Sequence, residues 1–261
     1  MRAHIVLISI IASAVVGVLA SGAPGAITIS DVMVVNGKYY LNGADQNDYG
    51  YDLSVDGTGI TSVTVAGPNS TSFTLNNDGD SWNAESWPHF STEAALRAAF
   101  PVGDYTFNFN GGAASSKVNF AGTAPGGIAT GLTPPDGSTG VSTTPTFTWS
   151  AVPSDYGIGI HADVRDVFLD HTVAETFPPL SMSATSWPCP VTLDTGEQYE
   201  LDLEVAQGSI SSDTIDGTSF PIYSVYIYGN AVDFTTTPEP ASLALLAAGG
   251  LGILARLRAR R

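Results

Sequence analysis

Short segments in which apolar and polar residues alternate recur along most of this chain, and helical periodicity is almost absent. Residues 105–109 read Tyr-Thr-Phe-Asn-Phe, and residues 62–65 read Ser-Val-Thr-Val. This alternation places every second side chain on the same face of a strand, so that one face is apolar and the other polar. Clusters of Gly, Ser, Asn and Asp separate the segments, as turns do. The pattern predicts an all-β protein.

One segment departs from the alternation and predicts a single short helix between Ser91 and Phe100. Ser91 or Thr92 can cap the first turn, where Glu93 is also favourable. Leu96 and Phe100 are four residues apart and would share one helical face. A proline directly after Phe100 and a glycine two residues later end the helix.

A stretch rich in Gly and Pro divides the chain near its middle. It runs from Gly122 to Thr144 and has too few apolar side chains to form a layer of its own. We therefore predict two β-sandwich-like domains, at residues 27–121 and 132–234, joined by a linker at residues 122–131. The first domain contains the short helix.

The second domain carries a pattern found in immunoglobulin-like sandwiches. Thr146–Trp149 is expected to be a strand with its Trp inside, and Leu193–Tyr199 leads through a glycine turn into a strand with alternating apolar residues. A tyrosine in this place forms the tyrosine corner of such sandwiches. In order and spacing, the domain resembles a fibronectin type III domain. It departs from that family where an Asp-Thr pair replaces the usual proline-containing turn, and in its unusually aromatic final hairpin, Phe220–Phe234.

The N-terminus has the features of an export signal. Arg2 and His4 precede a mostly apolar stretch, Ile5–Ala20, that ends in small or compact residues. This order is typical of a secretory signal peptide, which we place at residues 1–20. The alternative is an uncleaved anchor helix, for which the stretch is short.

The last 24 residues form a second hydrophobic segment with three parts. Pro238, Glu239 and Pro240 are followed by 15 uncharged residues and then by a cluster of cations. The cations are Arg256, Arg258, Arg260 and Arg261. Arginines stay on the cytoplasmic side of a membrane, whereas the apolar run is shorter than the roughly 20 residues of a spanning helix. The tail therefore predicts a weak, removable anchor that leaves the preceding chain outside the cytoplasm.

These three parts resemble the C-terminus of the PEP-CTERM family of bacterial exported proteins. The resemblance implies that exosortase, a membrane enzyme, recognises and cuts the tail, and that the chain is anchored only transiently in the inner membrane. It also implies a destination in the cell envelope or the extracellular matrix. The resemblance covers only residues 238–261 and implies a route rather than a biochemical activity.

Between its two hydrophobic ends the chain is strongly acidic. Residues 21–237 include four basic and 24 acidic residues, which gives a net charge of −20. Such a surface repels nucleic-acid phosphates and acidic lipid headgroups, which argues against nucleic acid and peripheral membrane binding. Solubility is the simplest interpretation of this charge, although the same charge would attract divalent cations.

The single cysteine, Cys189, lies between two prolines. A chain with one thiol forms no internal disulfide, so its stability must come from a core. No basic residue or histidine is close in sequence to lower the pKa of this thiol, and we expect a small, buried apolar residue rather than a reactive one.

Oxygen-bearing side chains gather in a predicted loop at residues 42–59. Asp45, Asn47, Asp52 and Asp56 are candidate calcium ligands, because hard cations prefer carboxylates and amides. Their spacing does not match the helix-loop-helix calcium loop, since the twelfth position counted from Asp45 is an aspartate rather than a glutamate. Hairpin turns use the same residue types, so solvated turns are the alternative. No other cofactor is expected.

Histidines and acids also crowd residues 161–171. The group comprises His161, Asp163, Asp166, Asp170 and His171. On a strand, His161, Asp163 and Arg165 would share one face, and we expect this to be a solvated outer face rather than a transition-metal site.

Aromatic residues offer a possible carbohydrate platform. Trp82 and Trp87 bracket several polar residues in a loop-rich stretch, and Tyr223, Tyr226 and Tyr228 line the last hairpin. Either set could stack on sugar rings, although aromatic residues in strands more often belong to the core.

The chain lacks the sequence signatures of common enzymes, including the Gly-x-Ser-x-Gly elbow, His-Glu-x-x-His and phosphate-binding glycine loops. We therefore expect a non-enzymatic exported protein, structural or adhesive, in association with exopolysaccharide. A carbohydrate-binding module is the alternative. A polysaccharide hydrolase or lyase that uses an unrecognised carboxylate pair is a third hypothesis.

Overall fold

The computed structural model of the protein describes residues 26–79, 81–152, 157–176 and 178–237, without the side chains of residues 86–89. The predicted signal peptide at residues 1–20 and the sorting tail at residues 238–261 lie outside this part. Within it, no helix is long and apolar enough to cross a membrane.

A large sheet forms the centre of the body, and its longest strands are the hairpin β14 (Gln198–Ile215) and β15 (Thr218–Thr236). β1 (Thr28–Leu41) pairs in parallel with β15, and β2 (Ala44–Thr58) pairs antiparallel with β1. The strand order is β12-β11-β14-β15-β1-β2-β6-β5, and β9 also pairs with β15. The remaining strands of this sheet are β5 (Asn76–Asn77), β6 (Ser81–Phe90), β9 (Ser138–Val141), β11 (Gly157–Asp166) and β12 (His171–Glu175).

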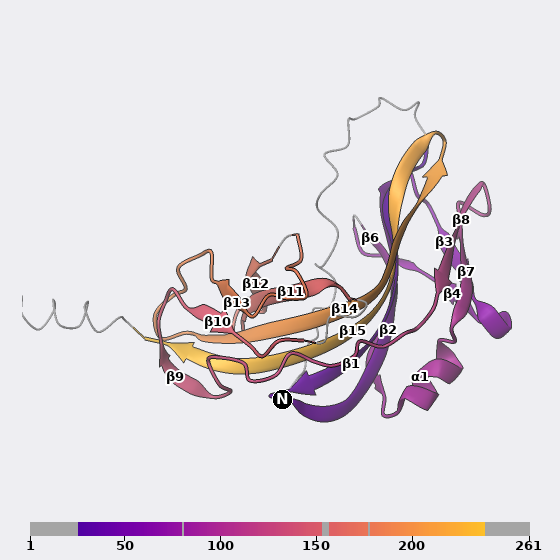
Figure 1. The fold of residues 1–261 in the computed structure, drawn as a ribbon. Helices are drawn as coiled ribbons and strands as arrows, with labels where there is room; N and C mark the ends of the chain where they lie inside the picture. Colours follow the sequence, from indigo (N-terminus) through magenta and orange to yellow (C-terminus); the bar gives the residue numbers. More distant parts are fainter. Residues whose placement is uncertain (1–25, 80, 153–156, 177, 238–261) are drawn as a thin grey trace, which may run out of the picture.

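Two smaller sheets complete the described fold (Figure 1). A four-stranded sheet has the order β4-β3-β7-β8, and a two-stranded sheet pairs β10 with β13. Their strands are β3 (Val63–Ala66), β4 (Ser72–Thr74), β7 (Gly103–Phe109), β8 (Ala114–Phe120), β10 (Thr146–Thr148) and β13 (Ser186–Pro188). A 3₁₀ turn, η1 (Pro68–Ser70), lies between β3 and β4. The all-β prediction with one short helix is confirmed.

The first core lies between the large sheet and the four-stranded sheet. Its alternating strands behave as the sequence predicts: Val65, Tyr105, Phe107 and Phe109 are fully buried, and polar neighbours in the same strands face outwards. Leu53 of β2 belongs to the same core. The burial of these large side chains is the main stabilising contribution of this half.

The predicted helix is α1 (Glu93–Ala99), and it closes one side of the first core. The Thr92 hydroxyl caps it by accepting a hydrogen bond from the Ala95 N–H, 3.2 Å away. Leu96 and Phe100 are fully buried. The Phe100 ring stacks on Tyr105 with a centroid separation of 4.7 Å.

The second core lies between the other end of the large sheet and the pair β10–β13. Trp149 is buried there, and its indole N–H donates a hydrogen bond to the Ala184 carbonyl at 2.8 Å. Phe147 stacks on Trp187 with centroids 5.6 Å apart. Tyr199 is buried at the start of β14, as the predicted tyrosine corner requires.

The long hairpin connects the two cores. β14 and β15 have 18 and 19 residues, about 60 Å at the usual rise of a strand. The hairpin therefore extends beyond the second core. Ile215, Phe220 and Ile222, which lie close to its turn, pack in the first core. The predicted boundaries at residues 121 and 132 stay a prediction, but the first core draws on residues from both sides of them.

Candidate functional site

The described body ends in ordered structure directly before the sorting tail. Two hydrogen bonds join the end of β15 to the residues just before β14. The Thr236 N–H donates to the Glu197 carbonyl at 3.1 Å, and the Gly196 N–H donates to the Thr236 carbonyl at 3.0 Å. The Thr237 N–H donates to the Val141 carbonyl at 2.9 Å. The backbone is thus held up to the residue before Pro238. The predicted sorting residues themselves, Pro238, Glu239, Pro240 and the four arginines, lie outside the described residues.

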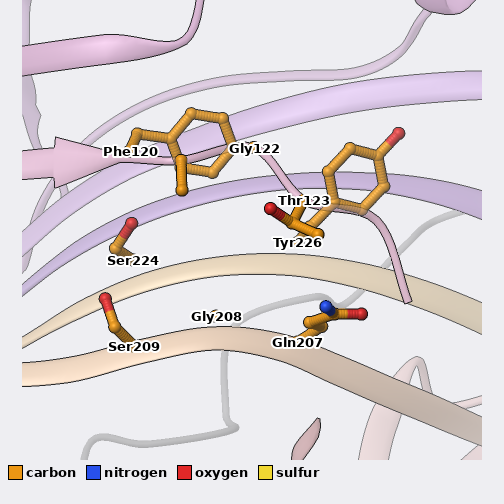
Figure 2. Close-up of a pocket in the computed structure, with 9 residues that line it drawn as sticks. Phe120, Gly122, Thr123, Gln207, Gly208, Ser209, Ser224 and Tyr226 are labelled. Carbon is orange, nitrogen blue, oxygen red and sulfur yellow. The ribbon is translucent and has the colours of Figure 1, made fainter. Parts of the chain in front are cut away.

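A cavity of about 360 Å³ lies between the end of β8 and the long hairpin β14–β15 (Figure 2). The end of β8 and the following residues form one wall, and the middle of the long hairpin forms the other. The lining residues are Phe120, Ala121, Gly122, Thr123, Gln207, Gly208, Ser209, Ser224 and Tyr226. This lining offers hydroxyl and amide groups but contains no His, Cys, Asp, Glu, Lys or Arg. It can form hydrogen bonds but has no side chain suited to general acid or base catalysis at neutral pH.

The carbohydrate candidates belong mainly to strands rather than loops. Trp82 lies in β6, is partly buried and packs against the first core. Trp87 is also in β6, but its side chain lies outside the described part. Tyr226 is buried beneath Arg97, whose guanidinium carbon is 5.1 Å from the ring centroid. Tyr226 therefore has no open face for a sugar, and carbohydrate binding by the two tryptophans stays a prediction.

The calcium candidates lie on a strand, so the prediction of a loop at residues 42–59 is wrong. Most of this range belongs to β2, which is hydrogen-bonded to β1 on one side and to β6 on the other. Asp45 and Asp56 pair with residues nine positions apart on β1, which corresponds to roughly 30 Å along the strand. The four candidates cannot converge on one ion in this arrangement.

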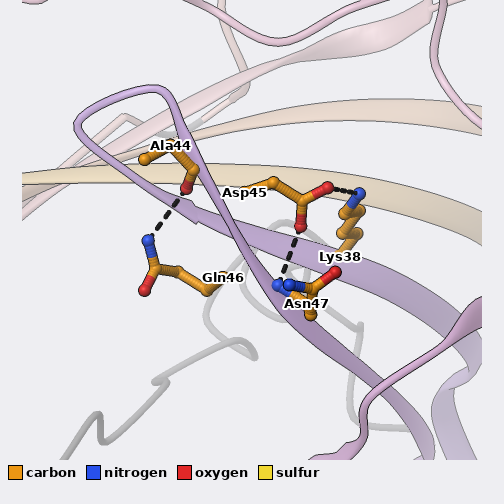
Figure 3. A network of polar contacts seen from close by, with 5 residues as sticks. All are labelled: Lys38, Ala44, Asp45, Gln46 and Asn47. Atoms are coloured by element: carbon orange, nitrogen blue, oxygen red, sulfur yellow. Dashed lines mark hydrogen bonds and ion pairs between the residues drawn. The ribbon is translucent and has the colours of Figure 1, made fainter.

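The contacts of the individual candidates agree with this. Asp45 forms an ion pair with Lys38 and accepts a hydrogen bond from the Asn47 N–H at 2.8 Å (Figure 3). Asp52 is fully buried, and its carboxylate oxygens make no hydrogen bond within the described structure. Burial, followed by the nearby Glu85, raises the pKa of Asp52 to about 8. Among the described residues, no group of His, Cys, Asp and Glu is arranged to hold a metal ion.

The segment that starts at His161 differs most from its prediction. His161, Asp163 and Arg165 do share one face of β11, but that face is buried rather than solvated, and His161 is only 2% exposed. The pairing register explains which groups meet there: His161 lies opposite Glu204, and Asp163 lies between Asp202 and Glu175 on the two neighbouring strands. Three further residues belong to the predicted group. Asp166 ends β11, His171 begins β12, and Asp170 lies in the turn between these strands.

The buried face brings His161 close to three acids. Its ring nitrogens lie 3.6 Å from Glu204 Oε2, 3.8 Å from Asp163 Oδ2 and 3.5 Å from Glu175 Oε2. Burial lowers the pKa of His161, and it raises the pKa of Glu204 to about 8. The pKa of Asp163 is raised well above its ordinary value by burial and then by Asp202. The alternation of acids in residues 200–204 was the only sequence signal for this cluster.

Cys189 is partly buried among residues of the second core. Burial raises the pKa of its thiol. This agrees with the expected unreactive, largely apolar role.

The comparison with protein families identifies the tail. Residues 236–261 match the model of the PEP-CTERM protein-sorting motif. No curated protein shows significant similarity to the chain.

Two solved structures resemble the chain weakly. The FN1–FN3 domains of chicken CNTN1 are 14% identical, with a TM-score of 0.30, over 82% of this chain and 66% of that one. The BSP domain of a biofilm-associated protein is 12% identical, with a TM-score of 0.21, over 83% of this chain and 30% of that one. The chain thus spans less than two thirds of either structure. The strand order and the two cores define its fold, rather than these two likenesses. We conclude that this all-β chain carries a PEP-CTERM protein-sorting motif at residues 236–261, which marks it as an exported protein processed by exosortase.

Proposed function

We propose that this protein is a non-enzymatic component of the cell envelope or extracellular matrix, structural or adhesive, in association with exopolysaccharide. Exosortase removes its tail after a transient stay in the inner membrane. The observation that carries the proposal is the position at which the folded body ends. Thr237 still donates a hydrogen bond to Val141, and the sorting residues begin at the next position.

This position makes the tail separable from the fold. The described members of both cores all precede Pro238. A cut after the last strand therefore removes no described core side chain. Prolines disfavour helix, so we expect the Pro-Glu-Pro block to favour an extended cleavage region that a membrane enzyme can reach.

The experiment that tests the proposal is mass spectrometry of both termini of the protein recovered from the envelope and extracellular fractions of its own organism. We expect a C-terminus near Pro238 and an N-terminus after the signal peptide. In a strain that lacks exosortase, the same peptides should extend into the tail. Recovery of peptides that end at Arg261 from mature envelope protein would contradict the proposal.

A matched variant tests the role of the basic cluster. Replacing Arg256, Arg258, Arg260 and Arg261 with serine should reduce the membrane-bound precursor, because those charges stop transfer across the membrane. The body should keep its melting temperature, since none of the described core residues is changed. A variant that is retained and processed normally would show that the arginines are not the stop signal.

A further inference from the structure

The turn between β11 and β12 presents three consecutive apolar side chains to solvent. Val167, Phe168 and Leu169 are 43%, 85% and 63% exposed. Elsewhere in the described chain, the large apolar residues that are exposed occur singly, and none is as exposed as Phe168. Isolated exposed apolar residues are common, whereas a contiguous group marks a contact surface. We call residues 167–169 the apolar turn.

The apolar turn is held in shape by the residues on either side of it. The Asp166 carboxylate accepts hydrogen bonds from the N–H groups of Phe168 and Leu169, at 2.9 and 2.7 Å. The Asp170 N–H donates to the Asp166 carbonyl at 3.0 Å. Asp170 has a left-handed backbone with φ of 57° and forms an ion pair with Arg165. The turn is therefore preorganised, which reduces the entropic cost of contact with a partner.

The apolar turn lies at the end of the large sheet where the body continues into the sorting tail. The Val167 N–H donates to the Gln198 carbonyl at 3.1 Å, and Gln198 is opposite Thr235 in β15. β11 is two strands from β15, so the turn is about 10 Å to the side of the end of β15. The uncharged run of the tail begins at Ala241, at most about 14 Å of extended chain beyond Thr237.

We propose that the apolar turn inserts into the interfacial layer of the membrane that holds the tail, so that the precursor body has two contacts with the bilayer. The proposal rests on the transient anchoring described under the proposed function. A short linker gives the turn a high effective concentration at the membrane, so a contact that is weak by itself becomes populated. Once the tail is cut, the contact loses this advantage and the body leaves the membrane.

The charge of the body determines which lipids allow this contact. The acids that flank the turn are engaged locally, Asp166 by amide groups and Asp170 by Arg165. The remaining negative charge of the body opposes approach to acidic headgroups. Insertion should therefore be strongest in zwitterionic membranes and should depend on the tail in acidic ones.

The test uses the full chain with its tail in phosphatidylcholine vesicles. The variant F168W places a tryptophan in the turn, and brominated acyl chains quench a tryptophan that enters the membrane. The matched control is I210W, because Ile210 is also exposed, at 56%, but lies in β14 about 40 Å along the strand from Gln198. The fluorescence of the unsubstituted chain is subtracted from each variant. L169W serves as a second probe within the turn.

We expect the tryptophan at position 168 to be quenched several-fold more by brominated lipid than the one at position 210, with an emission shifted to shorter wavelength. Equal, water-like emission at both positions would overturn the proposal. An emission shift of the tryptophan at position 168 that appears only when exosortase is added would also overturn the proposal, because it would indicate contact with the enzyme rather than with lipid. Flotation of the vesicles measures the insertion of the tail separately, so a failure of anchoring is distinguished from a failure of the turn to insert.

Discussion

The phenol oxygen of Tyr199 accepts a hydrogen bond from the backbone N–H of Asp194, with a separation of 2.9 Å. The Tyr199 ring is buried and stacks on Phe234, whose centroid is 5.8 Å away. The contact fastens the turn before β14 to the start of that strand. It lies at the same end of the body as Thr236, whose hydroxyl donates to the Asp194 carbonyl. The corner therefore stabilises the end of the fold to which the sorting tail is attached.

Replacement of Tyr199 by phenylalanine removes this hydrogen bond and keeps the ring. The Asp194 N–H then loses its partner, and we expect the free energy of unfolding to fall by about 1 to 3 kcal/mol. Urea unfolding of the body, residues 21–237, measures the change. Tyr223→Phe is the control, because Tyr223 is half-buried and the structure describes no hydrogen bond from its hydroxyl. If the two variants lost the same free energy of unfolding, the corner role of Tyr199 would be rejected.

Stability should fall as the pH rises from about 4 to about 8. Burial raises the pKa of Asp31 to about 7 and those of Asp52 and Glu204 to about 8, from ordinary values of 3.8 for aspartate and 4.5 for glutamate. Between the ordinary and raised values, the folded state binds more protons than the unfolded state, so each unit of pH increase favours unfolding. Thermal melts from pH 4.5 to 8.5 at constant ionic strength measure the trend. A melting temperature that rises over this interval would contradict it.

Asp52→Asn should remove part of this dependence. An amide keeps the shape of the protonated acid but cannot ionise, so the variant should match the parent near pH 4 and exceed its stability by about 2 to 4 kcal/mol near pH 8. The exposed Asp78→Asn is the matched control and should leave the pH profile unchanged. If the Asp52 variant were less stable than the parent at both pH values, the buried carboxylate would have to be ionised and paired.

Gly208→Ala tests the place where the long hairpin passes from one core to the other. Gly208 has a φ of 157°, and a Cβ there would lie 1.9 Å from the Ser224 carbonyl oxygen. Since the clash is with backbone of the paired strand, the strands must separate, and we expect a loss of more than 3 kcal/mol. Gly217→Ala is the control, because Gly217 also has a positive φ of 82° but has open space around its position. Gly217→Ala should lower the free energy of unfolding by on the order of 1 kcal/mol. If urea unfolding gave the same loss for both variants, backbone strain alone would account for the effect at Gly208.

Calcium should stabilise the body no more than magnesium does at the same ionic strength. Asp45 is paired with Lys38, Asp52 is buried, and the strand keeps Asp56 far from Asp45. Added salt will still raise the melting temperature by screening the net charge of −20. Differential scanning calorimetry with calcium, magnesium and sodium chloride at the same ionic strength distinguishes screening from binding. A rise specific to calcium that disappears when Asp45 and Asp52 are replaced by alanine would establish a site that the described geometry does not form.

The sequence by itself determined much of the local structure and the sorting motif of this protein. Alternation identified strands such as β7, because a period of two residues is visible without any knowledge of partners. The helix start was predicted to within one residue, at Ser91 or Thr92, since capping depends on neighbours within one turn, and Thr92 is the cap. The tail was identified from the order of its parts, which is visible in the sequence alone.

Only the tertiary structure decided which faces are covered and which strands meet. Alternation shows that β11 has two faces, but it does not reveal that the face with His161 is buried, because that depends on what packs against it. The residues of β2 have turn-like composition. They nevertheless form a strand, because β1 and β6 provide hydrogen-bond partners for its backbone N–H and C=O groups on both sides. β1 pairs with β15 across about 190 residues of sequence, as in Val35 with Val225. Such pairing is set by burial of distant apolar faces against each other, which no local pattern encodes.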